Sequence, residues 1–152
     1  MEHITIPRHA LVVVCDGAKA LLFRNEGDAE LVNLKAIEHF AEFEPPAHDL
    51  GTDRPGRVYQ SHGSARSAVE TTDFHEAGEV EFLAMVAADL GKLVASEKPK
   101  ALFVVAPPKA LGILRQHFGD VVRAAITAEI AKDLAHLPTN EIERHLTGKS
   151  TL

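Results

Sequence analysis

A run of six apolar residues, Ala101 to Ala106, constrains the fold more than any other feature of the sequence. Such a run is typical of a strand that is buried on both faces, with helices covering each side of its sheet. Residues 76 to 96 precede it and repeat apolar side chains at the three- and four-residue spacing of an amphipathic helix. Pro107-Pro108 follows it, and because proline is tolerated at a helix start, we expect a helix from there to about Phe118.

The beginning of the chain predicts three antiparallel strands. Leu11 to Cys15 and Ala20 to Phe23 are apolar segments separated by the turn dipeptide Asp16-Gly17, a pattern typical of a hairpin. Residues 25 to 28 form a second turn sequence, and a third strand is expected between Leu31 and Ile37.

The end of the chain predicts one more strand and one more helix. Val121 to Ile130 is rich in β-branched residues and is expected to be a strand, and Thr139 or Asn140 can cap a terminal helix, with Glu143 completing a capping box. The predicted fold class is therefore α/β: a mixed sheet that opens with three antiparallel strands, followed by helix, strand, helix, strand and helix. We expect one domain over residues 1–152.

Composition excludes several classes of protein. Hydrophobic residues make up 45% and charged residues 25% of the chain, which is typical of a globular domain and not of collagen, disorder or a disulfide scaffold. The single cysteine, Cys15, has no partner for a disulfide and is expected to be a core side chain whose ionisation is discouraged by the neighbouring Asp16. No signal peptide and no apolar run of membrane-spanning length is evident, so we expect a cytoplasmic protein without membrane insertion.

Residues 44 to 74 are expected to form a long functional loop, because proline and glycine interrupt every candidate period. Within it, Pro55-Gly56 can form a type II turn that presents Arg54 and Arg57 from one bend. Two guanidinium groups displayed in this way suit recognition of phosphate or carboxylate. The alternative is that Asp53 pairs with one arginine and only holds the turn.

Motifs for catalysis are missing from the sequence. It contains no Gly-x-Ser-x-Gly elbow, no Gly-rich phosphate-binding loop and no histidine or cysteine spacing typical of zinc. We therefore predict no catalytic residues, no metal site and no cofactor. The alternative is a small metal-dependent hydrolase or nuclease that uses histidines and aspartates of the loop, which are His48, His62, His75, Asp49, Asp53 and Asp73.

Charge is unevenly distributed along a chain whose net charge is -6. Residues 69–97 carry seven acidic side chains and one lysine, whereas residues 98–123 carry five basic side chains and one aspartate. We expect Glu79 and Glu81 to belong to an acidic face apart from the binding surface. Lys132-Asp133 with His136 is either a local ion pair or part of that binding surface.

Several ordered motifs together resemble the bacterial host attachment protein family, small domains described as required for attachment to host cells. The resemblance extends over nearly the whole chain. The motifs are Asp16-Gly17-Ala18-Lys19-Ala20, Gly51 to Arg57, Ala106-Pro107-Pro108-Lys109, Leu111-Gly112 with Leu114-Arg115, Lys132-Asp133-Leu134 with Leu137-Pro138, and Glu141 to Leu146.

The resemblance implies a fold like the middle domain of eukaryotic and archaeal peptide-chain release factors and of Pelota. This chain contains no Gly-Gly-Gln, the loop with which release factors admit water. Our leading hypothesis is a non-enzymatic binding module for structured RNA or the ribosome, and the other alternative is an adhesion or signalling factor that acts through a protein partner. The expected ligand-binding residues are Asp53, Arg54, Gly56, Arg57, Arg115 and Lys132.

Overall fold

A computed structural model describes residues 3–37 and 64–148, with side chains described for 3–37 and 78–148. Its elements, in chain order, are β1 (Leu11–Cys15), β2 (Ala20–Asn25), β3 (Leu34–Ala36), α2 (Ser64–Glu97), β4 (Leu102–Ala106), α3 (Pro108–His117), α4 (Asp120–Ala125), β5 (Ile126–Ala131) and α5 (Thr139–Thr147).

The strands form one mixed sheet in the order β3-β2-β1-β4-β5. β1 pairs antiparallel with β2, and β2 pairs antiparallel with β3. β4 lies parallel to β1 on one side and to β5 on the other. The α/β class and the mixed sheet with three antiparallel strands at its start are thus confirmed.

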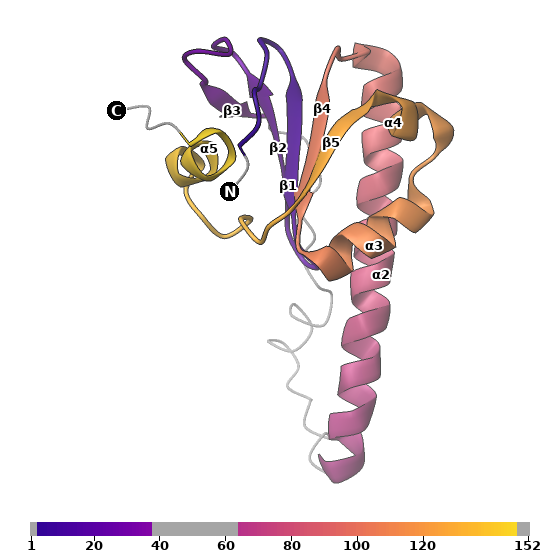
Figure 1. Cartoon of the computed structure of the whole chain (residues 1–152). Coiled ribbons are helices and arrows are strands. Elements are labelled where there is room, and N and C mark those ends of the chain that lie inside the picture. Colours follow the sequence, from indigo (N-terminus) through magenta and orange to yellow (C-terminus); the bar gives the residue numbers. More distant parts are fainter. Residues whose placement is uncertain (1–2, 38–63, 149–152) are drawn as a thin grey trace.

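Helices cover both faces of this sheet. α2, α3 and α4 lie on one face, and α5 lies on the other (Figure 1). Along β1, Leu11, Val13 and Cys15 belong to the core under α2 and α3, while Val12 and Val14 belong to the core under α5. Burial on both faces explains why this strand and β4 carry no polar side chain.

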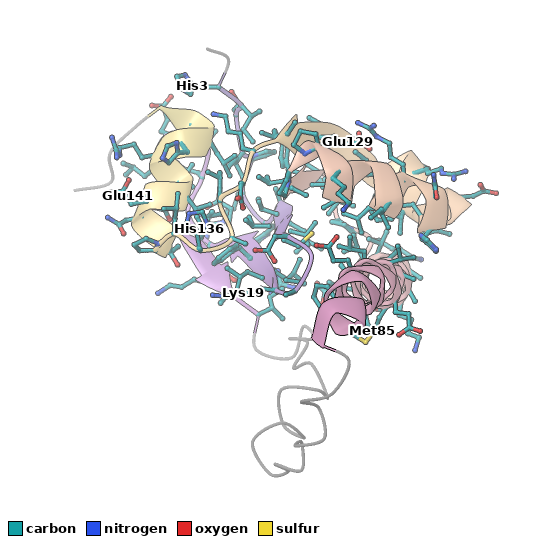
Figure 2. The ribbon with its side chains drawn as sticks, turned by 90° about the horizontal axis from the view of Figure 1, so that it is seen from below. His3, Lys19, Met85, Glu129, His136 and Glu141 are labelled. Carbon is teal, nitrogen blue, oxygen red and sulfur yellow. The ribbon has the colours of Figure 1, made fainter. Side chains whose placement is uncertain are left out.

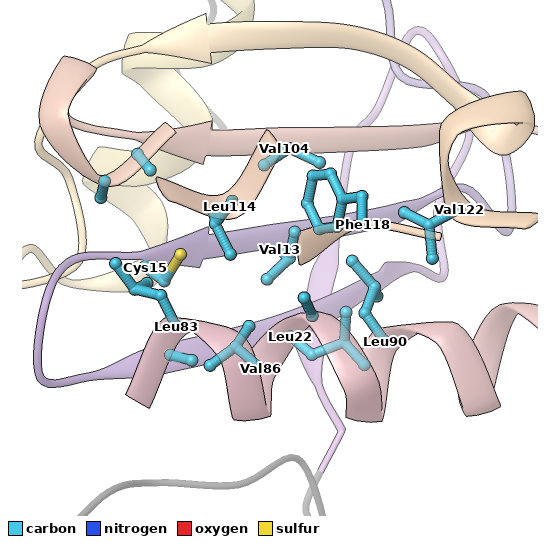
Figure 3. Close-up of a cluster of buried hydrophobic side chains, with 14 of the residues drawn as sticks. Val13, Cys15, Leu22, Leu83, Val86, Leu90, Val104, Leu114, Phe118 and Val122 are labelled. Carbon is cyan, nitrogen blue, oxygen red and sulfur yellow. The ribbon is translucent and has the colours of Figure 1, made fainter. Parts of the chain in front are cut away.

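The larger core lies between the sheet and α2. Leu83, Val86 and Leu90 point from α2 toward Val13 and Leu22 of the sheet (Figure 3). Their three- and four-residue spacing places them on one helix face, as the amphipathic pattern predicted.

The start of α2 corrects the predicted loop. α2 begins at Ser64, whereas the sequence interpretation extended the loop to Phe74 and began the helix at Glu76, so that interpretation is wrong for residues 64–74. The last glycine of the loop is Gly63, and no proline or glycine occurs from there to Phe74, so nothing in this stretch breaks a helix. At 34 residues, α2 is about 51 Å long and extends past the sheet (Figure 1).

The predicted last strand is also partly wrong. Asp120–Ala125 is the helix α4, and only Ile126–Ala131 forms β5. The β-branched pair Val121-Val122 suggested a strand, but the two side chains have different surroundings in α4. Val122 is buried against α2, while Val121 is 54% exposed. Packing against α2 therefore overrides the strand propensity.

The terminal helix forms where expected, but its capping box does not. The N-cap of α5 is Pro138, without a side-chain cap, so the predicted pairing of Asn140 with Glu143 is wrong. Glu143 is buried and accepts a hydrogen bond from the backbone N–H of Leu34 at 2.8 Å. This hydrogen bond connects α5 to β3.

Candidate binding site at the carboxyl edge

The carboxyl ends of β1, β4 and β5 lie on one side of the sheet, because the three strands are parallel. We call this side, with the segments 16–19, 107–109 and 132–136 that follow the three strands, the carboxyl edge. The first turns of α2 extend past the sheet on this side (Figure 1). In open α/β sheets, ligands bind outside the carboxyl ends of the strands.

The turn after β1 is held by Asp16. Its Oδ1 accepts hydrogen bonds from the backbone N–H groups of Ala18 and Lys19, each at 2.9 Å. Its own N–H donates to the carbonyl of Lys19 at 2.9 Å, which closes the hairpin that the Asp16-Gly17 dipeptide predicted. Lys19 is therefore the last residue of a hydrogen-bonded turn at the carboxyl edge (Figure 2).

Glu79 joins α2 to this edge. A Cβ at Gly17 would lie 2.6 Å from Glu79 Oε2, so the glycine leaves room for the carboxylate. Glu79 Oε1 also lies 3.6 Å from Nζ of Lys109, in the first turn of α3. Glu79 therefore lies at the carboxyl edge, whereas Glu81 is exposed, and a separation of the two from the binding surface stays a prediction.

The segment after β5 brings further charged side chains to the edge. Lys132 donates from Nζ to the backbone carbonyl of His145 at 3.2 Å, in the last turn of α5, where a cation complements the helix dipole. Asp133 and His136 are exposed and lie 3.8 Å apart, from Oδ1 to Nδ1. His136 and Lys19 are both visible when the molecule is seen from this edge (Figure 2).

Arg115 lies elsewhere. Its Nε and Nη2 are both 2.7 Å from Oε1 of Glu129, in the middle of β5. Arg123 of α4 donates from Nη2 to the Arg115 carbonyl at 3.0 Å. The expected binding residues Arg115 and Lys132 are thus positioned by different parts of β5, one beside the strand and one after its end.

The remaining expected binding residues, Asp53, Arg54, Gly56 and Arg57, lie outside the described residues, as do His48, Asp49 and His62. Asp73 and His75 belong to α2, in the part whose side chains are not described. In the sequence, Lys19 and Lys109 were identified as members of family motifs and not as binding residues. The signal that could have selected them is their position directly after two predicted strands.

Cys15 is a core side chain, as predicted. Burial first, and the neighbouring Asp16 carboxylate second, raise the pKa of the Cys15 thiol to about 12. A thiol with this pKa is not a nucleophile near neutral pH. Among residues 3–37 and 78–148, no three His, Cys, Asp or Glu side chains are grouped to hold a metal ion.

None of the helices in the described part of the chain combines the length and the apolar character needed to span a bilayer.

Comparison with known proteins places the chain in a family. No curated protein matches the sequence at a significant level. A family model matches residues 11–146, which run from the start of β1 almost to the end of α5 and include every segment of the carboxyl edge. The chain therefore belongs to the family described as protein required for attachment to host cells.

Proposed function

We propose that this protein is a non-enzymatic, cytoplasmic binding module that engages the phosphate groups of structured RNA, such as ribosomal RNA, through its carboxyl edge. One observation carries the proposal: segments far apart in the sequence bring Lys19, Lys109 and Lys132 to the same edge of the sheet.

Of the acidic side chains at the edge, Asp133 is exposed and lies 3.8 Å from His136, while the other two are engaged within the protein. Asp16 accepts two backbone hydrogen bonds, and Glu79 lies against Gly17 and Lys109. Lys19 has no hydrogen-bond or ion-pair partner for its ammonium group among the described residues. An ammonium group on a flexible stem, placed at a rigid turn, suits contact with a phosphate oxygen.

The net charge of -6 disfavours diffuse attraction to nucleic acid, so affinity must be concentrated at a local site. The resemblance of the sequence motifs to the host attachment family, which implies a fold like the release-factor middle domain, supports RNA as the source of the phosphates. The absence of a Gly-Gly-Gln motif and the buried state of Cys15 support binding without hydrolysis. The metal-dependent alternative predicts phosphodiesterase activity that a chelator abolishes.

The test is co-sedimentation of the purified protein with ribosomes from its own cells, repeated over a range of salt concentrations. A double variant, Lys19→Ala with Lys109→Ala, removes two charges from the carboxyl edge. Each lost phosphate contact should reduce the slope of log affinity against log salt by about 0.7 to 0.9. We expect a total reduction of up to roughly 1.4 to 1.8 for the pair.

The matched control is Lys92→Ala with Lys100→Ala, which removes two exposed lysines near the opposite end of α2 and before β4. This control should bind with the parent salt slope. If the two double variants lose the same affinity, or if the parent protein does not co-sediment at any salt concentration, the proposal is wrong.

A further inference from the structure

The two edges of the sheet are closed to different degrees. At the β3 edge, the N–H of Ile37 donates to the carbonyl of Leu22 in β2 at 2.8 Å. Because backbone groups alternate along a strand, the N–H of Leu34 points away from β2. Glu143 of α5 accepts that outward N–H at 2.8 Å. The three-residue β3 edge is thus short and covered.

The β5 edge is longer and open. The N–H of Leu11 donates to the carbonyl of Ala101 at 3.0 Å, so alternation turns the backbone groups of Val104 toward β5. Val104 stands opposite Glu129 and bonds the residues on either side of it, which leaves the N–H and C=O of Glu129 and Ala131 facing outward. No other segment of the described chain pairs with these outward groups.

An open hollow of about 420 Å³ adjoins this edge on the side of α3 and α4. A bulge at Thr127 shifts the register, so that Ile126 and Glu129 project from the same face of β5 although they are three residues apart. Glu129 lies alongside α3 and α4 in Figure 2. The hollow is lined by Arg115, Phe118, Arg123, Ile126 and Glu129.

The hollow is positively charged and partly apolar. Glu129 is neutralised by Arg115 at 2.7 Å, which leaves the second arginine, Arg123, in excess. Arg123 is 56% exposed and forms a long ion pair, at 3.9 Å, with the fully exposed Asp120 of its own helix, which does not line the hollow. Phe118 and Ile126 supply apolar surface beside these charges.

We infer that β5 receives an extended segment of a partner protein as an added strand, with an acidic side chain against Arg123 and an apolar side chain against Phe118 and Ile126. Strand addition uses main-chain hydrogen bonds for affinity and side-chain pockets for specificity. The outward N–H and C=O groups of Glu129 and Ala131 provide the main-chain hydrogen bonds, and the hollow provides the side-chain pocket. Side chains two residues apart on a strand share one face, so the segment has the pattern acidic-x-apolar.

Charge and backbone chemistry favour this occupant over two others. A second copy that paired its β5 antiparallel would place two hollows on the same face, and their excess arginines would meet. RNA could contact Arg123 but does not supply alternating N–H and C=O groups at the spacing of a strand. This site is separate from the carboxyl edge proposed for RNA.

The experiment uses the full-length protein and an array of capped heptapeptides. Each peptide carries one charged residue and, two positions later, one valine, and threonine is placed between them. We expect members with aspartate to bind and members with lysine in its place not to bind. The strongest binder is then labelled with fluorescein, and its affinity is measured by fluorescence anisotropy. Arg123→Glu should weaken that binding at least tenfold.

Ala131→Pro removes one outward N–H without removing a hydrogen bond to β4, and it should also weaken binding at least tenfold. The control is Arg144→Glu on α5, where the arginine is also 56% exposed and pairs with an acid of its own helix. It should bind the peptide as the parent does. Thermal melts verify that each variant is folded. If Ala131→Pro does not fold, Arg123→Glu still tests the inference.

Three results would overturn the inference. The first is an array without preference for aspartate over lysine. The second is a dimer in solution that Ala131→Pro dissociates, since a second copy would then occupy the edge. The third is an Arg123→Glu variant that binds peptide like the parent but loses ribosome binding. The inference and the RNA proposal fail separately, because Lys19→Ala with Lys109→Ala should leave peptide binding unchanged.

Discussion

Replacing Asn25 tests whether a buried polar side chain holds the N-terminal segment to the sheet. Asn25 is fully buried at the end of β2. Its Nδ2 donates to the carbonyls of Ile6 at 2.9 Å and Pro7 at 3.2 Å. Its Oδ1 accepts from the N–H groups of Gly27 and Asn33, each at 2.9 Å. One side chain thus joins the N-terminal segment to the turn that follows β2.

Asn25→Ala removes these four hydrogen bonds and a fifth, longer one from Nδ2 to the carbonyl of Asp28 at 3.3 Å. At about 1 kcal/mol for each of the four shorter bonds, we expect the free energy of unfolding to fall by about 4 kcal/mol. Native domains are stable by about 5 to 15 kcal/mol, so this loss is a large share of the total. The melting temperature should fall by roughly 8 to 16 °C. The measurement is urea unfolding followed by far-ultraviolet circular dichroism, with the parent m-value retained.

Asn33→Ala is the matched control, because the hydrogen bonds of the exposed Asn33 recorded in the structure come from its backbone. Its stability should change by less than about 0.5 kcal/mol. If Asn25→Ala costs no more than Asn33→Ala, the side-chain network does not stabilise the fold, and the reasoning from buried hydrogen bonds is refuted.

Three further changes test other contacts. Gly27→Ala would place a Cβ 2.0 Å from the carbonyl oxygen of Leu31, so this variant should unfold at markedly lower urea concentration. Because burial raises the pKa of Cys15 to about 12, its thiol should react with iodoacetamide at pH 8 only in denaturant. Because the thiol of the unfolded chain ionises at lower pH than that of the folded chain, the free energy of unfolding should also fall from about pH 9 upward. Equal labelling rates for the folded and the denatured protein would contradict this reasoning. Glu143→Ala should cost about 1 to 3 kcal/mol by leaving the N–H of Leu34 without its partner, while Glu143→Gln should recover most of that loss in urea melts.

Local patterns in the sequence determined the elements that depend on near neighbours. Asp16-Gly17 between two apolar segments specifies a hairpin, because the aspartate bonds backbone groups two and three residues later. The apolar run Ala101 to Ala106 specifies a strand buried on both faces, because each of its faces meets a helical layer. Cys15, at the end of a buried strand, was likewise predicted as a core side chain, but the sequence indicated only Asp16 as the group that discourages its ionisation, whereas burial is the larger cause of its raised pKa.

Interpretation from the sequence was wrong where a distant contact decided the outcome. Val121-Val122 has strand propensity, but packing of Val122 against α2 makes this segment a helix. Asn140 and Glu143 have the spacing of a capping box, but the Glu143 carboxylate bonds the backbone of Leu34, which is 109 residues away. Neither partner can be identified from neighbouring residues, because both contacts exist only after the chain has folded.

The candidate sites divide in the same way. The sequence by itself supplied the motif residues that follow the strands, including Lys19, Lys109 and Lys132. Only the tertiary structure decided that these segments share one edge, because strand order and direction depend on pairing between residues far apart in the chain. It also decided that Glu79 reaches that edge and that β5 lies open at the end of the sheet, since a helix register and a sheet edge are set by packing and not by local pattern.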